Sequence, residues 1–182
     1  MRPVDQSPPR GFTFTEMMFA LAMLAVLLSL AVPALHRLQQ RDRIATAANE
    51  LVAHINLARL NAVTKSEVTV VCPGNPTAGC SGDNRWDRGW IVFRDPDRDG
   101  APNAPSDVLR VAGRLAHLHA DSAGRTRIRY QPTGFAPGTN LTIKLCAPAS
   151  DQAGAVIVSN PGRPRVDSLP DHLACPASPG WR

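Results

Sequence analysis

The fold is decided by the stretch Phe12–Leu35, FTFTEMMFALAMLAVLLSLAVPAL, which is long, apolar and close to the N-terminus. At a helical rise of about 1.5 Å per residue, the stretch is long enough to cross a bilayer core of about 30 Å. Glu16 is its one charged residue. A secretory signal peptide would have a shorter apolar core followed by a small-residue cleavage site. We therefore expect this stretch to remain on the protein as a transmembrane helix.

The helical pattern continues beyond the apolar stretch and becomes one-sided. Apolar residues then recur at spacings of three and four, at Ile44, Ala48, Leu51, Ile55, Ala58 and Ala62. Charged residues such as Arg41, Glu50 and Arg59 lie off this stripe, which is typical of a helix with one face on a protein core. We predict one helix in two halves, a transmembrane half over residues 12–35 and an amphipathic half over residues 36–65.

Residues 66–182 change to short runs separated by Gly, Pro, Asn and Asp, which predicts a small β domain with a C-terminal tail. The strands that we expect are residues 68–72, 90–94, 108–115, 125–131, 141–146 and 155–159. In the fourth of these, Ile128 and Tyr130 alternate with arginines, as in a strand with one buried face. The predicted fold class is α+β, a long N-terminal helix packed on a small antiparallel sheet.

The overall composition is that of a globular protein, because 43% of the residues are hydrophobic and 19% are charged. The formal net charge of +5 favours polyanionic partners or anionic surfaces. No GxSxG, HExxH or phosphate-loop motif occurs, and the histidines form no zinc pattern. The segment Asp95–Gly100 has the alternating oxygens of a calcium loop, but Ser106 stands where such a loop has glutamate, so we interpret it as a turn. We expect no enzymatic activity, no cofactor and no metal.

The chain has four cysteines, Cys72, Cys80, Cys146 and Cys175, and none forms a CxxC pair. An even number beyond a membrane span indicates disulfides in an oxidising compartment, which places the C-terminal domain outside the cytoplasm. Arginines occur on both sides of the span, so the positive-inside rule does not fix its orientation. Four cysteines can form two disulfides in three ways. We favour the arrangement in which Cys72 pairs with Cys80 and Cys146 pairs with Cys175. Buried free thiols are the alternative.

The residues at the start of the span, Arg10–Met18 (RGFTFTEMM), resemble the type III signal of type IV pilins and pseudopilins. The resemblance implies that residues 1–11 are a leader peptide, which a prepilin peptidase removes by cutting after Gly11. Phe12 would then be the methylated mature N-terminus, and Glu16 would occupy the fifth mature position, where the family keeps a glutamate. A carboxylate in hydrocarbon needs a partner, and in a filament the N-terminal ammonium of a neighbouring subunit is suited to that role.

The β domain is similar to the GspH/FimT group of minor pilins. The similarity is carried by Trp86–Phe93 (WDRGWIVF), by the acidic turn after it, and by a later strand that ends at Cys146. The segment Gly162–Arg165 (GRPR) resembles the GRxR motif through which FimT-type minor pilins bind DNA during natural transformation. The fold that this resemblance implies is the type IV pilin fold, with residues 66–182 as a periplasmic globular domain.

Two basic features could form the DNA site. Gly162, Arg163 and Arg165 belong to the GRPR turn, in which two guanidinium groups flank a proline that stiffens the chain. A second basic surface is expected on the strand face that carries Arg125, Arg127 and Arg129, extended by Lys144 from another strand. The alternative for the first is a solvated basic turn, and for the second the solvent side of an amphipathic strand.

The resemblance implies a FimT-like minor type IV pilin that takes part in pilus assembly and binds extracellular double-stranded DNA for uptake. Its expected partners are other major and minor pilins, prepilin peptidase, the inner membrane and double-stranded DNA. The expected location is the bacterial inner membrane, as a single-pass protein with a periplasmic domain that is incorporated into a pilus or pseudopilus. The alternatives are a GspH-like pseudopilin of a type II secretion system, an adhesin, for which the chain has few aromatic residues, and a membrane-anchored enzyme.

Overall fold

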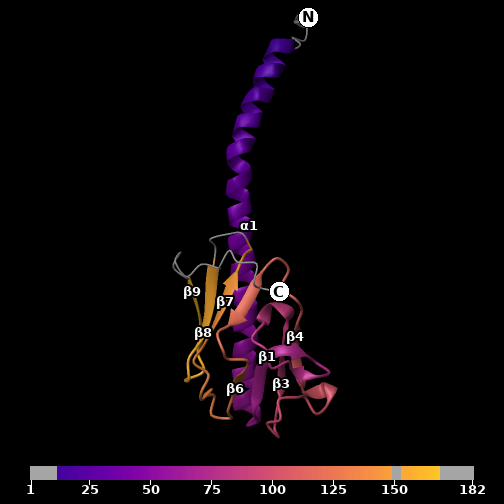
Figure 1. Cartoon of the computed structure of the whole chain (residues 1–182), viewed down its shortest axis with the longest axis vertical. Coiled ribbons are helices and arrows are strands. Elements are labelled where there is room, and N and C mark those ends of the chain that lie inside the picture. Colours follow the sequence, from indigo (N-terminus) through magenta and orange to yellow (C-terminus); the bar gives the residue numbers. More distant parts are fainter. Residues whose placement is uncertain (1–11, 149–152, 169–182) are drawn as a thin grey trace, which may run out of the picture. The chain divides into compact units, whose positions relative to one another are not determined.

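The computed structural model describes residues 12–148 and 153–168, and Figure 1 shows how its elements follow one another. The chain divides into two units, Met1–Gln39 and Gln40–Arg182, and each is described here by itself. One helix, α1 (Phe14–Lys65), runs through the first unit and into the second. The long N-terminal helix that the sequence predicts is therefore confirmed.

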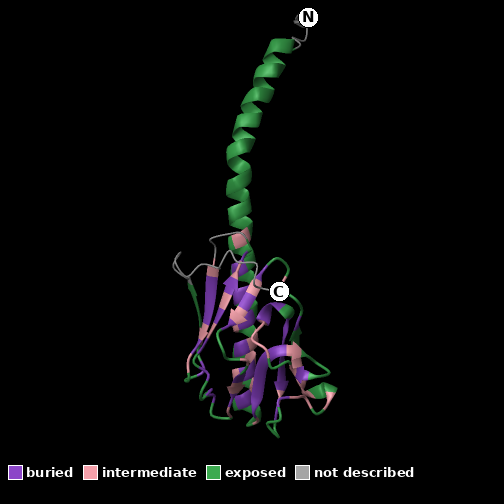
Figure 2. Ribbon diagram, in the orientation of Figure 1, coloured by how far each residue is buried: buried purple, intermediate pink, exposed green. Residues whose placement is uncertain are grey.

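Within the first unit, the described residues belong almost entirely to α1, and every one of their side chains is exposed, as Figure 2 shows. The helix continues through Pro33, whose ring removes one backbone donor without ending the element. The large apolar side chains exposed on this part of α1 are Phe14, Met17, Met18, Phe19, Leu21, Met23, Leu24, Val26, Leu27, Leu28, Leu30, Val32, Leu35 and Leu38. By length and composition this helix can cross a membrane.

The second unit contains two antiparallel sheets. The first sheet has the strand order β2-β1-β3-β4, and β6 also pairs with β1. The second sheet has the order β5-β7-β8-β9. Their bounds are β1 (Thr69–Asn75), β2 (Gly79–Cys80), β3 (Trp90–Arg94), β4 (Val108–Ala112), β5 (His119–Ser122), β6 (Ile128–Tyr130), β7 (Leu141–Cys146), β8 (Ala153–Val158) and β9 (Pro164–Ser168). Two short 3-10 helices, η1 (Trp86–Arg88) and η2 (Pro105–Asp107), lie in the connections.

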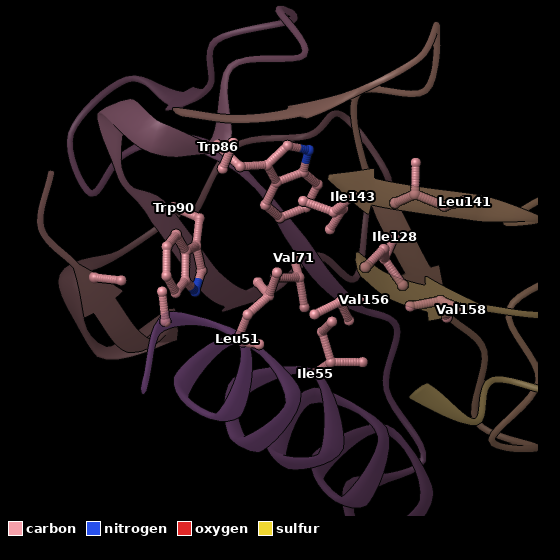
Figure 3. Packing of buried hydrophobic residues seen from close by; sticks show 14 of the residues in the cluster. Leu51, Ile55, Val71, Trp86, Trp90, Ile128, Leu141, Ile143, Val156 and Val158 are labelled. Carbon is pink, nitrogen blue, oxygen red and sulfur yellow. The ribbon is translucent and has the colours of Figure 1, made fainter. Parts of the chain in front are cut away.

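The core of the second unit lies between α1 and the inner faces of both sheets. All the residues of the predicted helical stripe are buried, namely Ile44, Ala48, Leu51, Ile55, Ala58 and Ala62. Figure 3 shows Leu51 and Ile55 pointing towards Val71, Trp90 and Val156. The alanines let the helix approach the sheets closely, and each buried Leu or Ile contributes about 1.5–3 kcal/mol to folding. This half of α1 is therefore stabilised by packing as well as by its own hydrogen bonds.

The first sheet is buried on its other face as well. Val70, Cys72, Ile91 and Phe93 form a separate cluster on that face. A disulfide joins Cys72 to Cys80 with an S–S distance of 2.03 Å and a Cα–Cα distance of 5.5 Å, and so ties β1 to β2. This is one of the two favoured pairings. Cys175 lies outside the described residues, so the pairing of Cys146 with it stays a prediction.

Several predicted strands needed correction. The strands at residues 90–94 and 141–146 have the predicted bounds. The strand expected over residues 125–131 is only Ile128–Tyr130, which pairs with Thr69–Val71 of β1. Three strands were not predicted, β2, β5 and β9. The α+β fold class is nevertheless confirmed.

Candidate functional site

The N-terminal end of α1 presents a carboxylate in its first turn. Thr13 precedes the helix, and its hydroxyl accepts a hydrogen bond from the backbone N–H of Glu16 at 3.3 Å. This bond satisfies a donor that the helix itself cannot pair, and the helix dipole favours a negative charge at this end. The side chains of Phe12 and Glu16 are exposed, whereas Gly11 lies outside the described residues. The Glu16 carboxylate therefore points to where a group of another molecule can reach it.

The segment Gly162–Arg165 follows the turn between β8 and β9. The Gly162 N–H donates to the Ser159 carbonyl at 2.7 Å, which closes that turn. Gly162 has a φ of +77°, in the left-handed region that favours glycine. A Cβ at this position would lie 2.6 Å from the Gly134 carbonyl oxygen and 2.6 Å from Cε1 of Tyr130. Glycine is thus required both by the backbone conformation and by the lack of space.

Three hydrogen bonds fix the turn to the rest of the second unit. The Tyr130 hydroxyl donates to the Gly162 carbonyl at 2.8 Å. The Asn160 carbonyl accepts from the N–H of Ala136 at 3.0 Å, and its side-chain oxygen accepts from the N–H of Thr139 at 3.1 Å. Burial raises the pKa of Tyr130, so its hydroxyl remains protonated and able to donate at neutral pH. The turn is therefore held by both sheets.

The two arginines of the turn face solvent. Arg163 lies just before β9 and Arg165 lies within it, and both side chains are exposed. Pro164 and Val166 pair with core-facing residues of β8, so Arg165 between them points to the outer face of the second sheet. Among the residues that the structure describes, no carboxylate forms an ion pair with either guanidinium. Both charges are free to meet an anion from outside.

The predicted basic strand face is wrong as a single surface. Arg125 and Arg127 precede β6, which begins at Ile128, so they do not alternate along a strand with Arg129. Nη2 of Arg129 lies 3.5 Å from a carboxylate oxygen of Asp95, and this aspartate is fully buried. Much of the Arg129 charge is therefore compensated within the protein. A role of these arginines in binding stays a prediction.

Lys144 belongs to the other sheet. It lies on β7 opposite Asp121 of β5. Burial raises the pKa of that aspartate, and Lys144 acts in the opposite direction by favouring its charged form. The strand register places Lys144 on the same outer face as Arg165, on strands separated by β8. Lys144 thus shares a sheet face with Arg165.

Two further arginines lie next to the segment between β6 and β7 that holds the turn. Nε of Arg59, on α1, donates to the Gly134 carbonyl at 3.1 Å, and that same oxygen contacts Gly162. Nη1 of Arg125 lies 3.7 Å from the position of a Cβ on Gly138, in the segment that holds the turn. Sequence reasoning missed Arg59 because only tertiary packing brings the helix to this turn. The sequence signal that could have indicated this close approach is Gly134, a glycine shortly after β6.

The acidic segment after β3 forms a turn in which three carboxylates lie close together. Carboxylate oxygens of Asp95, Asp97 and Asp99 lie within 4.8 Å of one another. Asp95 accepts from the N–H of Gly100 at 3.2 Å, Asp97 from the side-chain amide of Asn103 at 3.0 Å, and Asp99 from a backbone N–H at 2.8 Å. Donors from the protein thus bind all three carboxylates, as they do in turns that aspartate residues stabilise.

Comparison with known proteins places this arrangement in context. The family described as "Type II transport protein GspH" matches residues 47–162, and the "Prokaryotic N-terminal methylation motif" matches residues 7–32. The fold is similar to two crystal structures of the type IV minor pilin FimU of Pseudomonas aeruginosa, both at 22% identity. The first has a TM-score of 0.57 and covers 76% of this chain and 97% of the FimU chain. The second has a TM-score of 0.53 and covers 72% of this chain and 97% of the FimU chain. No curated protein matches the chain.

Proposed function

This chain belongs to the type II transport protein GspH family of pilin-like proteins, and from that premise we propose that it is a FimT-like minor pilin that binds extracellular DNA for uptake. Its general role, a minor type IV pilin or pseudopilin, follows from the family, the methylation motif and the fold. The family and the fold are those of structural proteins without enzymatic activity.

The observation that carries the proposal is the exposure of Arg163 and Arg165 on a backbone that is already fixed. Arginine presents a permanent charge and a planar set of donors that suits phosphate. Because Gly162 and its hydrogen bonds hold the turn, binding would order only the side chains and cost less conformational entropy. Lys144 on the same face adds a further positive charge.

Binding of this kind would not depend on the DNA sequence. Contacts to phosphate oxygens position a protein on the duplex without reading the bases. They also release condensed counterions, so affinity falls as the salt concentration rises. Double-stranded DNA of any sequence is therefore the proposed partner of the turn.

The exposed part of α1 supports the assembly half of the proposal. Its apolar side chains have no partners within the described chain, so lipid or neighbouring pilin helices must cover them. We propose that prepilin peptidase cuts after Gly11 and that Glu16 then pairs with the new ammonium of a neighbouring subunit. The Cys72–Cys80 disulfide supports an oxidising location, the periplasm, for the second unit.

A GspH-like pseudopilin of a type II secretion system is the second candidate. The family match over residues 47–162 carries that description. Such a subunit would share the fold, the processing and the apolar helix, and it would have no need of the exposed arginines. Loss of Arg163 and Arg165 would then leave its activity unchanged, which separates the two candidates.

The test is a titration of the full chain, in uncharged detergent micelles, against a short DNA duplex at several salt concentrations. The variant is Arg163→Ala/Arg165→Ala, and the matched control is Arg110→Ala/Arg114→Ala, which removes two exposed arginines elsewhere. We expect salt-sensitive binding by the wild type, and a log–log salt slope that is smaller by about 2 in the turn variant. Absence of wild-type binding, or an equal loss in variant and control, would contradict the proposal.

A further inference from the structure

An aromatic ring is displayed beside the turn. Phe135 is 55% exposed, although the residues on either side of it are buried. The Gln131 N–H donates to the Phe135 carbonyl at 2.8 Å, and the Gly134 N–H donates to the Gln131 carbonyl at 2.8 Å. The next residue, Ala136, donates to the Asn160 carbonyl at 3.0 Å. The ring is therefore carried outward on a backbone that is hydrogen-bonded on both sides of it.

The backbone segment that carries this ring contacts one arginine directly and lies next to the residue that precedes another. Gly134, the residue before Phe135, accepts the hydrogen bond from Nε of Arg59 at 3.1 Å. The same carbonyl oxygen lies 2.6 Å from the position of a Cβ on Gly162, and Arg163 follows directly. The aromatic residue thus lies on the backbone segment that joins the Arg59 guanidinium to the arginine turn.

An exposed ring on a segment next to arginines is complementary to an anionic molecule with planar faces. Proteins that bind single-stranded nucleic acid without sequence preference combine positive charges along the backbone with aromatic rings on which bases stack. The bases of an intact duplex are stacked on one another, so a protein ring cannot stack on them without opening the helix. Phosphate contacts alone would not distinguish the two forms of DNA, but the ring would.

We propose that Phe135 is a base-stacking residue and that the site formed with Arg59, Arg163 and Arg165 prefers DNA with unpaired bases, such as a single strand or a frayed end, over an intact duplex. This inference rests on the proposed function, since Arg163 and Arg165 hold the phosphates in both. Stacking adds free energy only where a base is free to leave the helix. Duplex binding by the arginines alone remains, at lower affinity.

The test uses the full chain in uncharged detergent micelles, with a short single strand and the duplex that it forms with its complement. A 2-aminopurine in the strand reports stacking through its fluorescence. For Phe135→Ala we expect a loss of about five-fold or more in single-strand affinity and a change of less than about two-fold for the duplex. Phe135→Leu should lose as much, because it keeps an apolar side chain without an aromatic face, whereas Phe135→Trp should retain the affinity. The control is Val111→Ala, which shortens another exposed apolar side chain, on β4.

Other results would separate the stacking role of Phe135 from DNA binding by the arginines. Arginine-dependent binding of both DNA forms that is unchanged by Phe135→Ala would overturn the stacking role and leave the proposed function standing. An equal loss for single strand and duplex would mean that the ring supports the turn and does not stack. Unchanged DNA binding with reduced filament incorporation would assign the ring to a neighbouring subunit. Absence of binding to either DNA by the wild type would refute the proposed function and this inference together.

Discussion

At Gly162 a single residue determines whether the basic turn keeps its shape. Its φ of +77° disfavours any residue with a Cβ. An added Cβ would also lie only 2.6 Å from the Gly134 carbonyl oxygen and from the Tyr130 ring. The left-handed conformation alone costs a residue with a side chain about 1–2 kcal/mol. The steric overlap adds to that cost, because one of the two neighbours is backbone and cannot rotate away.

Gly162→Ala should therefore destabilise the protein more than an alanine at a glycine with open space around it. Gly124 is the matched control, since its φ is +79° and nothing lies within 4 Å of an added Cβ. We expect Gly124→Ala to cost about 1 kcal/mol and Gly162→Ala at least about 2 kcal/mol more. Thermal unfolding followed by tryptophan fluorescence measures both. Equal losses in the two variants would show that the contacts around Gly162 are not tight.

His54 gives the stability of the domain a pH dependence. Nδ1 of His54 accepts a hydrogen bond from the Trp90 indole N–H at 3.0 Å, which requires the neutral ring. Burial lowers the pKa of His54 from its usual value near 6.5, against an opposing effect of Glu50 and with some help from Arg110. Because the folded state lowers this pKa, the stabilisation is complete above pH 6.5 and is lost as the pH falls below it.

Unfolding of the wild type between pH 7.5 and 5 should show this loss, with a slope of at most about 1.4 kcal/mol per pH unit for one proton. His54→Gln provides the control, because its side-chain oxygen can accept the indole hydrogen bond and does not titrate. The variant should be less sensitive to pH over that range. The same pH profile in both proteins would mean that another group titrates.

The residues of the turn were predictable from the sequence, but the contacts that fix them were not. Gly162, Arg163 and Arg165 form a short motif that can be read from one segment. Arg59 and Tyr130 lie far from it in the sequence, and only the packing of α1 and β6 brings them to the turn. A tertiary contact of this kind leaves no local pattern of spacing or composition.

At the scale of elements, strands with a regular apolar pattern were predicted and strands defined by a partner were not. The runs WIVFR and LTIKLC gave β3 and β7 with their observed bounds. β9 begins with Pro164 and has one large apolar residue, so nothing in its own sequence indicates a strand. It exists because the edge of β8 pairs with it, and an edge strand tolerates proline at its start.

The β1–β2 hairpin depends on its disulfide. The pair β1–β2 is held by only two register positions, and Cys72 joins Cys80 across a sequence separation of 8. In the chain-entropy description a loop of this length contributes about 2–3 kcal/mol. The double variant Cys72→Ala/Cys80→Ala should therefore lower the free energy of unfolding by about that amount. Thr77→Ala in the same hairpin is the control, and a double variant as stable as this control would contradict the account.

The first turn of α1 makes a separate prediction about assembly. Glu16→Gln removes the charge but preserves size, so insertion of the apolar helix should be unchanged or easier. Incorporation into filaments should fall strongly, because the neighbouring ammonium would lose its partner. Immunoblots of the membrane fraction and of sheared filaments measure the two steps, with Ser29→Ala as the control. Normal incorporation of the Glu16→Gln subunit would show that this carboxylate has no role in assembly.

At the scale of the whole molecule, the sequence predicted the family and the fold class because both depend on long patterns. The apolar stretch and its flanking motif identify the helix, and the alternating runs identify the β domain. The expected domain boundaries, the orientation in the membrane and the DNA site depend on the environment and on partners that are absent from the chain itself.

The most direct test of the central claim is a comparison of DNA uptake and protein secretion in the native bacterium. The chromosomal gene would be replaced by the Arg163→Ala/Arg165→Ala variant, with Arg110→Ala/Arg114→Ala as the control and immunoblots to match subunit levels. We predict that uptake of labelled DNA falls at least about ten-fold in the turn variant, while secretion and the control strain are unchanged. DNA uptake in the turn variant that equals that of the wild type and the control would contradict the proposed role and favour the pseudopilin of a secretion system, which has no need of these arginines.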